Sequence, residues 1–298
     1  MLIFPVSTRV VRVQIQRLNG PVQTDESDFL AAEEPLEIRV DGRNVAVVMR
    51  TPGEDEELAA GFLVTEGLIH DAAGIADISH VPHCPGANRD VLVSDSNALD
   101  VRLKNPASVD FDKLTRHVFT SSSCGICSKS TIEAVRRQFP PIEDDCVMDA
   151  EVLFRLPQAL SSVQHTFNRT GGLHACALFD LDGSLLVLRE DVGRHNALDK
   201  VIGWALLKNQ LPLSRRALLL SGRASFEMLQ KSLAGGIPIV AAISAPSSLA
   251  VMFAQESGLT LAGFLRDARM NIYSGAKRLQ AAKAGSRCCR AKLKAEAA

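Results

Sequence analysis

The chain has 298 residues, of which 46% are hydrophobic and 22% are charged, and its formal net charge is −1. This is the composition of an ordinary soluble globular protein, and the length suffices for one large domain or two modest ones. The charge balance argues against a nucleic-acid-binding surface, and no apolar run reaches the roughly 20 residues needed to cross a bilayer. Seven cysteines are spread over the whole length, unlike a secreted disulfide framework, so we expect a cytoplasmic protein with reduced thiols.

The N-terminal part of the chain is predicted to be rich in β-strands. Apolar and polar residues alternate in part over residues 10–16, which is typical of a strand. Residues 36–40 and 45–49 flank an Asp-Gly turn that indicates a hairpin. A helix is predicted after this hairpin, because acidic residues fill its expected first turn. Gly67 is expected to end this helix. Further short strands are expected at residues 75–81, 91–94 and 99–103.

Two cysteines, Cys124 and Cys127, stand three positions apart between a run of serines and a helix predicted for residues 130–138. Thiols at this spacing can form a disulfide, bind a metal or hold a transferable sulfur atom. The helix start and Lys129 would both lower the pKa of a nearby thiol and so favour the nucleophilic thiolate. A mobile, serine-rich loop also suits a sulfur atom that must visit two partners.

Two other readings of this cysteine pair stay open. A zinc site needs a second pair of ligands, and His80, His83 and Cys84 do not have a common ligand spacing. A thioredoxin-like disulfide exchanger would need a compact strand–CxxC–helix unit, whereas the residues before Cys124 are polar and rich in serine.

From residue 146 onward, helices and apolar strands are predicted to alternate. Residues 174–181 and 184–188 flank a second Asp-Gly turn. Continuous apolar strands between amphipathic helices predict an α/β fold whose sheet is covered on both faces. The helices are expected at residues 150–160, 195–207, 225–234 and 247–256, and the strands at 217–220, 237–243 and 259–265. We therefore divide the chain, with a soft first boundary, into residues 1–145, residues 146–285 and a basic, disordered tail of residues 286–298.

Polar turns follow four of the predicted strands. The turn at residues 189–200 contains Asp191 and His195, which could move protons, and Arg194, which could bind phosphate. N-capping and local ion pairing explain these three residues slightly better than a functional role. The turns at residues 221–225, 244–248 and 263–269 carry serine, glycine or arginine before a helix or after a strand. Because such turns readily hold anions, the set predicts one elongated phosphate-binding site.

The remaining cysteines are expected to be structural or to be free thiols. His174 and Cys176 lack the His-x-Glu and Pro-Cys-x-x-Cys pattern of zinc deaminases, so a core histidine and a buried cysteine are expected. Cys146 has no partner in sequence and is expected to be structural. Cys288 and Cys289 are adjacent in sequence. Because adjacent cysteines form a disulfide only with strain, both are expected to be free thiols.

Taken together, these stretches resemble the FdhD family, the sulfur carrier and accessory proteins of formate dehydrogenase. The resemblance runs from about residue 35 to residue 275. The segments that carry it are residues 124–127 (CGIC), 170–175 (TGGLHA), 190–197 (EDVGRHNA), 221–223 (SGR), 244–246 (SAP) and 263–266 (GFLR).

The resemblance implies a cytidine-deaminase-like three-layer α/β sandwich with a smaller β-rich N-terminal part, and a homodimer. It also implies a sulfurtransferase that takes persulfide sulfur from a cysteine desulfurase. The acceptor would be the molybdenum or tungsten bis(molybdopterin guanine dinucleotide) cofactor of formate dehydrogenase, bound as a substrate, with no permanently bound metal. Cys124 matches the persulfide-bearing cysteine, and Cys127 matches its helper.

The cofactor-binding residues come from the resemblance and from the strand-end turns together. The expected residues are Phe264, Leu265, Arg266, Asp267, Ala268 and Arg269, with Ser221, Gly222, Arg223, Arg194 and His195. Two alternatives to sulfur transfer are a binding-only chaperone of the molybdenum cofactor and a CxxC thiol–disulfide oxidoreductase.

Overall fold

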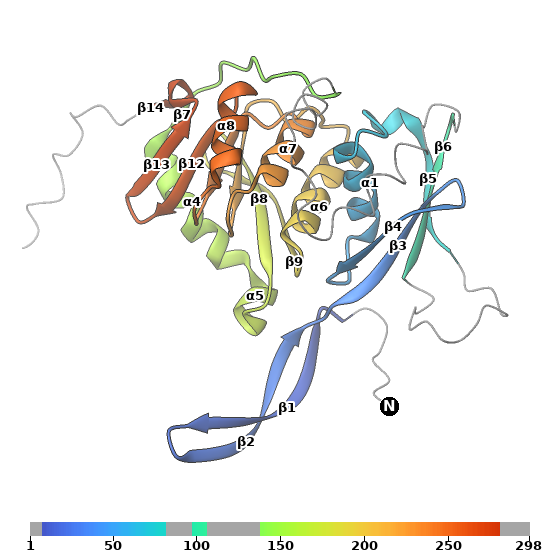
Figure 1. Cartoon of the computed structure of the whole chain (residues 1–298), viewed down its shortest axis with the longest axis vertical. Coiled ribbons are helices and arrows are strands. Elements are labelled where there is room, and N and C mark those ends of the chain that lie inside the picture. The colour runs from blue at the N-terminus through green and yellow to red at the C-terminus, as the bar shows by residue number, and fades with distance from the viewer. Residues whose placement is uncertain (1–7, 82–96, 106–137, 281–298) are drawn as a thin grey trace, which may run out of the picture.

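The computed structural model describes residues 8–81, 97–105 and 138–280. Cys124 and Cys127 lie outside these ranges, as do the strand predicted at residues 91–94, nearly all of the helix predicted at residues 130–138, and the basic tail. Figure 1 shows an α/β body, a β-rich part packed beside it through helix α1, and a two-stranded arm that projects from the body.

A six-stranded sheet forms the centre of the body, in the order β13-β12-β11-β10-β8-β9. Strands β10, β11 and β12 are parallel, and β8 is antiparallel to both of its neighbours, so β9 points in the same direction as β10. Strand β13 closes one edge, antiparallel to β12. The bounds are β8 His174–Asp180, β9 Leu185–Asp191, β10 Arg216–Leu220, β11 Ile239–Ala242, β12 Thr260–Arg266 and β13 Arg269–Ser274.

Helices cover both faces of this sheet, because its strands are apolar on both sides. On one face, Leu153, Leu156 and Leu160 of α4 pack against side chains such as Phe179 of β8. The other face belongs to a second core, to which Val201 of α6 contributes. The helices are α1 Asp55–Thr65, α4 Ala150–Val163, α5 His165–Thr170, α6 Arg194–Leu207, α7 Phe226–Ala234 and α8 Ser248–Glu256. The predicted α/β sandwich is confirmed.

The β-rich part contains a four-stranded sheet in the order β4-β3-β6-β5. Its β3–β4 turn is the predicted Asp-Gly hairpin, with Asp41 and Gly42 at φ values of 48° and 77°. Its apolar side chains belong to the same core as α6 and α7. The bounds are β3 Glu34–Val40, β4 Arg43–Arg50, β5 Ile75–His80 and β6 Ala98–Leu103. The boundary near residue 145 stays a prediction.

Helix α1 joins the two parts by crossing α6 at two glycines. A Cβ atom on Gly61 would lie 1.8 Å from the carbonyl oxygen of Asp199, and one on Gly203 would lie 1.8 Å from that of Glu57. The backbones therefore touch at this crossing, and neither position has room for a side chain.

The projecting arm consists of β1, Val10–Asn19, and β2, Val22–Ala31, paired antiparallel over ten residue pairs. The sequence predicts part of β1 but not β2, because Asp25, Glu26 and Asp28 disfavour a strand. Helix α5 and strand β13 are also additions to the predicted elements. The remaining elements are η1 Ala72–Gly74, β7 Met148–Asp149, η3 Ala276–Arg278 and β14 Leu279–Gln280. Within the described ranges, no helix is both long and apolar enough to span a membrane.

Candidate functional site

The carboxyl ends of β9, β10, β11 and β12 lie at one edge of the central sheet, as their common direction requires. Backbone hydrogen bonds join the turn after β10 to the turn after β11, and the turn after β11 to the end of β12. The amide of Ala224 donates to the Ala245 carbonyl at 3.2 Å, and the amide of Phe264 donates to the Ser244 carbonyl at 3.1 Å. From β12 to β9 this edge spans four strand spacings, about 19 Å. We call it the carboxyl edge.

The start of β8 fills the gap between the ends of β9 and β10. Ser221 fixes this junction, because its Oγ accepts the amide of Ala175 at 2.8 Å while its own amide donates to the Ala175 carbonyl. A Cβ atom on Gly222 would lie 3.3 Å from His174 Nδ1, so the histidine ring lies directly beside this turn.

His174 therefore lies on the carboxyl edge, and the expectation of a core histidine is wrong. It is half-buried, and burial lowers its pKa, with smaller contributions from the charges of Arg194, His195 and Arg223. Cys176, two residues further along β8, is buried as expected, and burial raises the pKa of its thiol.

Three helices begin at the carboxyl edge. Helices α6, α7 and α8 have Gly193, Ser225 and Ser247 as their N-caps, and only Ser247 caps its helix with its side chain, accepting the Ala250 amide at 3.2 Å. The first amides of a helix lack intrahelical acceptors and carry a partial positive charge. The carboxyl edge is thus polarised in favour of anions.

One arginine and one histidine of the predicted site, Arg194 and His195, meet around an acid that the sequence analysis did not single out. His195 Nε2 lies 3.0 Å from Glu227 Oε2, and Arg194 Nη2 lies 3.9 Å from the same oxygen. The hydrogen bond with His195 is the main cause that lowers the pKa of Glu227. Arg223 is exposed, and among the described residues no carboxylate pairs with it. Only the position of Glu227 in the first turn of α7 could have signalled its role.

The predicted stretch from Phe264 to Arg269 forms the end of β12, a tight turn and the start of β13. Phe264 is half-buried with φ at 53°, and Leu265 is fully buried on the α4 side of the sheet. The other four side chains, those of Arg266, Asp267, Ala268 and Arg269, are exposed. The structure thus brings this stretch to the carboxyl edge but leaves only part of it available to a ligand.

The acids at the end of β9 hold the fold together. Glu190 accepts the amides of Thr166 and Phe167 at the start of α5. Asp191 is fully buried, pairs with Lys200 at 2.8 Å and accepts the amide of Gly193. Capping and ion pairing are therefore the right interpretation for Asp191, whereas Arg194 and His195 remain partly exposed.

The structure does not test the cysteine pair, because residues 106–137 are not described. Of the alternative zinc ligands, His80 is exposed on β5, and His83 and Cys84 are outside the described ranges. The described residues contain no group of three side chains that could hold a metal ion. Cys146 is buried, and burial raises the pKa of its thiol to about 11, as suits a structural cysteine.

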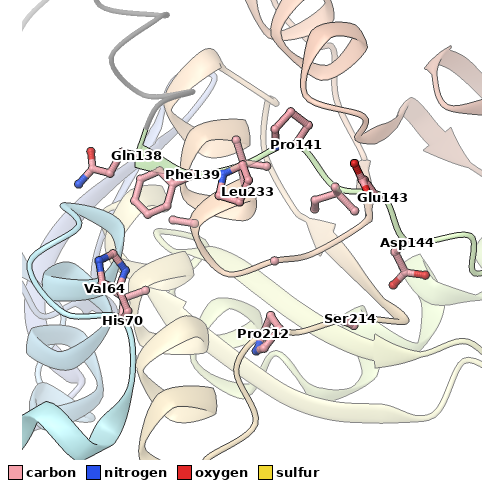
Figure 2. A pocket seen from close by; sticks show the side chains of 14 residues that line it. Val64, His70, Gln138, Phe139, Pro141, Glu143, Asp144, Pro212, Ser214 and Leu233 are labelled. Carbon is pink, nitrogen blue, oxygen red and sulfur yellow. The ribbon is translucent and has the colours of Figure 1, made fainter.

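A cavity of about 330 Å³ lies at the opposite edge of the sheet. Figure 2 shows its wall, which includes Pro212, ahead of β10, as well as Phe139 and Leu233. The lining is largely apolar, carries Glu143 and Asp144, and includes neither arginine nor lysine. It is therefore less suited to a phosphate-bearing ligand than the carboxyl edge.

Comparison with known proteins agrees with the resemblance. The model of the FdhD/NarQ family matches residues 31–280. A sulfur carrier protein FdhD of Mycolicibacterium paratuberculosis is 52% identical over 270 residues, covering 90% of this chain and 98% of the relative. Another, from Nocardia farcinica, is 48% identical over 278 residues, covering 93% and 97%. A solved protein from Desulfotalea psychrophila, described as a formate dehydrogenase accessory protein, superposes with a TM-score of 0.71 at 26% identity, covering 92% of this chain and all of its own.

Proposed function

Because the chain belongs to the FdhD/NarQ family, we propose that it is a sulfur carrier that activates the pterin cofactor of formate dehydrogenase. In this proposal a cysteine desulfurase supplies the sulfur, and Cys124 carries it as a persulfide. The recipient is the bis(molybdopterin guanine dinucleotide) cofactor, which the carrier binds as a substrate. The name shared by the curated relatives supports the carrier role, and the charge of the carboxyl edge supports the choice of an anionic recipient.

The sulfur steps follow from thiolate chemistry. The Cys124 thiolate attacks the outer sulfur of the desulfurase persulfide, which leaves the desulfurase as a thiolate and Cys124 as a persulfide. Cys127 then attacks the inner sulfur of Cys124. A Cys124–Cys127 disulfide forms, hydrosulfide leaves to the metal of the cofactor, and a cellular dithiol must reduce the disulfide before the next cycle.

The observation that carries the recipient assignment is the convergence of basic groups and helix starts on one edge. Arg194 and Arg223 lie with His174 beside the first turns of α6 and α7. Pyrophosphate groups suit helix N-termini and arginine side chains. An edge about 19 Å long also suits an elongated dinucleotide better than a compact ligand.

The carrier role predicts a measurable change in mass. After incubation with a cysteine desulfurase and cysteine, we expect the chain to gain about 32 Da per added sulfur atom. Peptide mapping should place the first added sulfur on Cys124. Treatment with a reducing agent should remove the gain, because a persulfide is reducible. No gain, or a gain only on other cysteines, would contradict the proposal.

The binding role predicts that Arg223 contributes to nucleotide affinity. Guanosine diphosphate serves as a probe because it contains the guanine and pyrophosphate of the proposed cofactor. Replacing Arg223 with alanine should weaken binding about tenfold, the effect of losing a charge-assisted hydrogen bond.

Arg216 provides the matched control for this titration. It lies at the opposite end of β10 and pairs with Asp180 at 3.4 Å, so Arg216→Ala should leave nucleotide affinity unchanged. Isothermal titration calorimetry would measure the affinity of guanosine diphosphate for both variants and for the wild type. Equal losses in the two variants would indicate a nonspecific charge effect and would contradict the assignment of the site.

A further inference from the structure

One carboxylate oxygen of Glu227 receives three polar groups of the carboxyl edge. His195 Nε2 lies 3.0 Å from Glu227 Oε2, and Arg194 Nη2 lies 3.9 Å from the same oxygen. The hydroxyl of Ser225 donates to this oxygen at 3.4 Å. Cationic side chains and hydroxyls at helix starts are also the groups that bind a phosphate oxygen. Glu227 therefore occupies a position that suits the phosphate of a ligand.

The helices on both sides of Glu227 begin without a side-chain cap. Gly193, the N-cap of α6, has no side chain, and the hydroxyl of Ser225, the N-cap of α7, does not accept an amide of its own helix. In α8, by contrast, Ser247 accepts the Ala250 amide. Uncapped first turns favour a negative group nearby. Glu227, the second residue of α7, is a negative group that the chain itself supplies.

The carboxylate of Glu227 is ionised and within reach of a ligand. The hydrogen bond with His195 is the main cause that holds the pKa of Glu227 below its ordinary value. The side chain of Glu227 is 44% exposed, and those of Arg194 and His195 are 35% and 34% exposed. Ion pairs that are this exposed to water are weak. Asp191 differs, because it is fully buried and pairs with Lys200 at 2.8 Å.

We propose that Glu227 is a built-in competitor for the phosphate groups of the recipient. It holds Arg194 and His195 in the free carrier and moves away when a pyrophosphate binds to them. This inference rests on the proposed function, because it requires an anionic recipient at the carboxyl edge.

Such a competitor makes release of the recipient easier. When the cofactor leaves, the carboxylate of Glu227 returns to Arg194 and His195, so these groups are not left without a partner. Because the free carrier has these contacts of its own, the affinity for the phosphates is lower than the two cations alone would give. The carrier thus gives up the cofactor more readily to the dehydrogenase.

Replacing Glu227 with glutamine tests the competition. Glutamine has the same size, and its amide oxygen can still accept a hydrogen bond from His195, so the fold should be kept. Guanosine diphosphate should bind Glu227→Gln about fivefold more tightly than the wild type, because a weak competing ion pair is removed. Isothermal titration calorimetry at constant ionic strength measures this change, since salt screens exposed charges.

Glu151 provides the matched control. It is exposed and is likewise the second residue of its helix, α4, which packs on the face of the sheet opposite to α6 and α7. Glu151→Gln removes the same charge and should leave the affinity for guanosine diphosphate unchanged. An equal gain in the two variants would show an effect of net charge and would overturn the proposal.

A second background separates competition from repulsion at a distance. In His195→Ala, Glu227 has lost its nearest partner but keeps its charge. The gain from Glu227→Gln should therefore fall to about twofold or less in this background, because the two residues act through one contact. The same fivefold gain with and without His195 would mean that Glu227 only repels the ligand, and the proposal would be wrong.

The titrations also distinguish this inference from the proposed function. If the wild type binds guanosine diphosphate and Glu227→Gln binds it equally or more weakly, Glu227 is not a competitor, and the sulfur-carrier proposal is unaffected. If the wild type does not bind guanosine diphosphate, the assignment of the recipient site fails, and this inference fails with it. The mass gain on Cys124 is measured without a nucleotide and tests the carrier role separately.

Discussion

Replacing Cys124 with serine should reduce the activity of the formate dehydrogenase that this chain serves by at least about a hundredfold, the scale expected when a covalent nucleophile is removed. A serine hydroxyl has nearly the volume of a thiol but is not ionised near neutral pH and cannot hold a transferable sulfur atom. The loss should therefore reflect chemistry rather than folding. The measurement is formate oxidation in cells whose own carrier gene has been deleted and replaced by each variant.

The other cysteines supply the controls for this experiment. Cys288→Ser makes the same chemical change in the basic tail and should retain wild-type activity. Cys127→Ala should slow sulfur transfer to the cofactor. A wild-type transfer rate in this variant would exclude an attack of Cys127 on the Cys124 persulfide. Full activity in Cys124→Ser would contradict the carrier mechanism and would favour a chaperone that only binds the cofactor.

Replacing Gly203 with alanine should destabilise the fold by about 4 kcal/mol or more, an exceptional value for a single added methyl group. The new Cβ would lie 1.8 Å from the carbonyl oxygen of Glu57 and 2.6 Å from its carbonyl carbon. These are backbone atoms of α1 and cannot rotate away, so α1 and α6 would have to separate and open gaps in the core. Native domains are stable by only about 5–15 kcal/mol, so the loss is large.

Chemical denaturation followed by circular dichroism would measure this effect. Gly74→Ala is the matched control, because a Cβ atom there has no other atom within 4 Å and the backbone is not in a left-handed conformation. It should change the free energy of unfolding by less than about 1 kcal/mol. If Gly203→Ala were equally mild, the close crossing of α1 and α6 would be wrong.

The role of the cysteine pair rests on the sequence alone. Cys124 and Cys127 were singled out by spacing, by the basic Lys129 and by the predicted helix start, and the described residues neither support nor oppose that choice. The carboxyl edge is different. The sequence predicts its turns one by one, and the structure joins the turns after β10 and β11 to each other and to the end of β12 by backbone hydrogen bonds.

Local signals determined much of the fold, because they act between residues close in sequence. The Asp-Gly turns at Gly42 and Gly183 predict the two hairpins that the structure contains. Apolar runs likewise located the strands β10, β11 and β12, since a buried strand needs no distant partner to be recognised.

Only the tertiary structure decided which polar groups and helices meet in space. It paired Glu227 with His195, buried Asp191 against Lys200, moved His174 from the expected core to the carboxyl edge, and brought Gly61 against Gly203. Each of these depends on how helices and strands pack in three dimensions, and no period or spacing in the sequence encodes the partner. Propensity and turn chemistry are set by neighbours along the chain, whereas ion pairs and close helix crossings are set by the packing of the whole core.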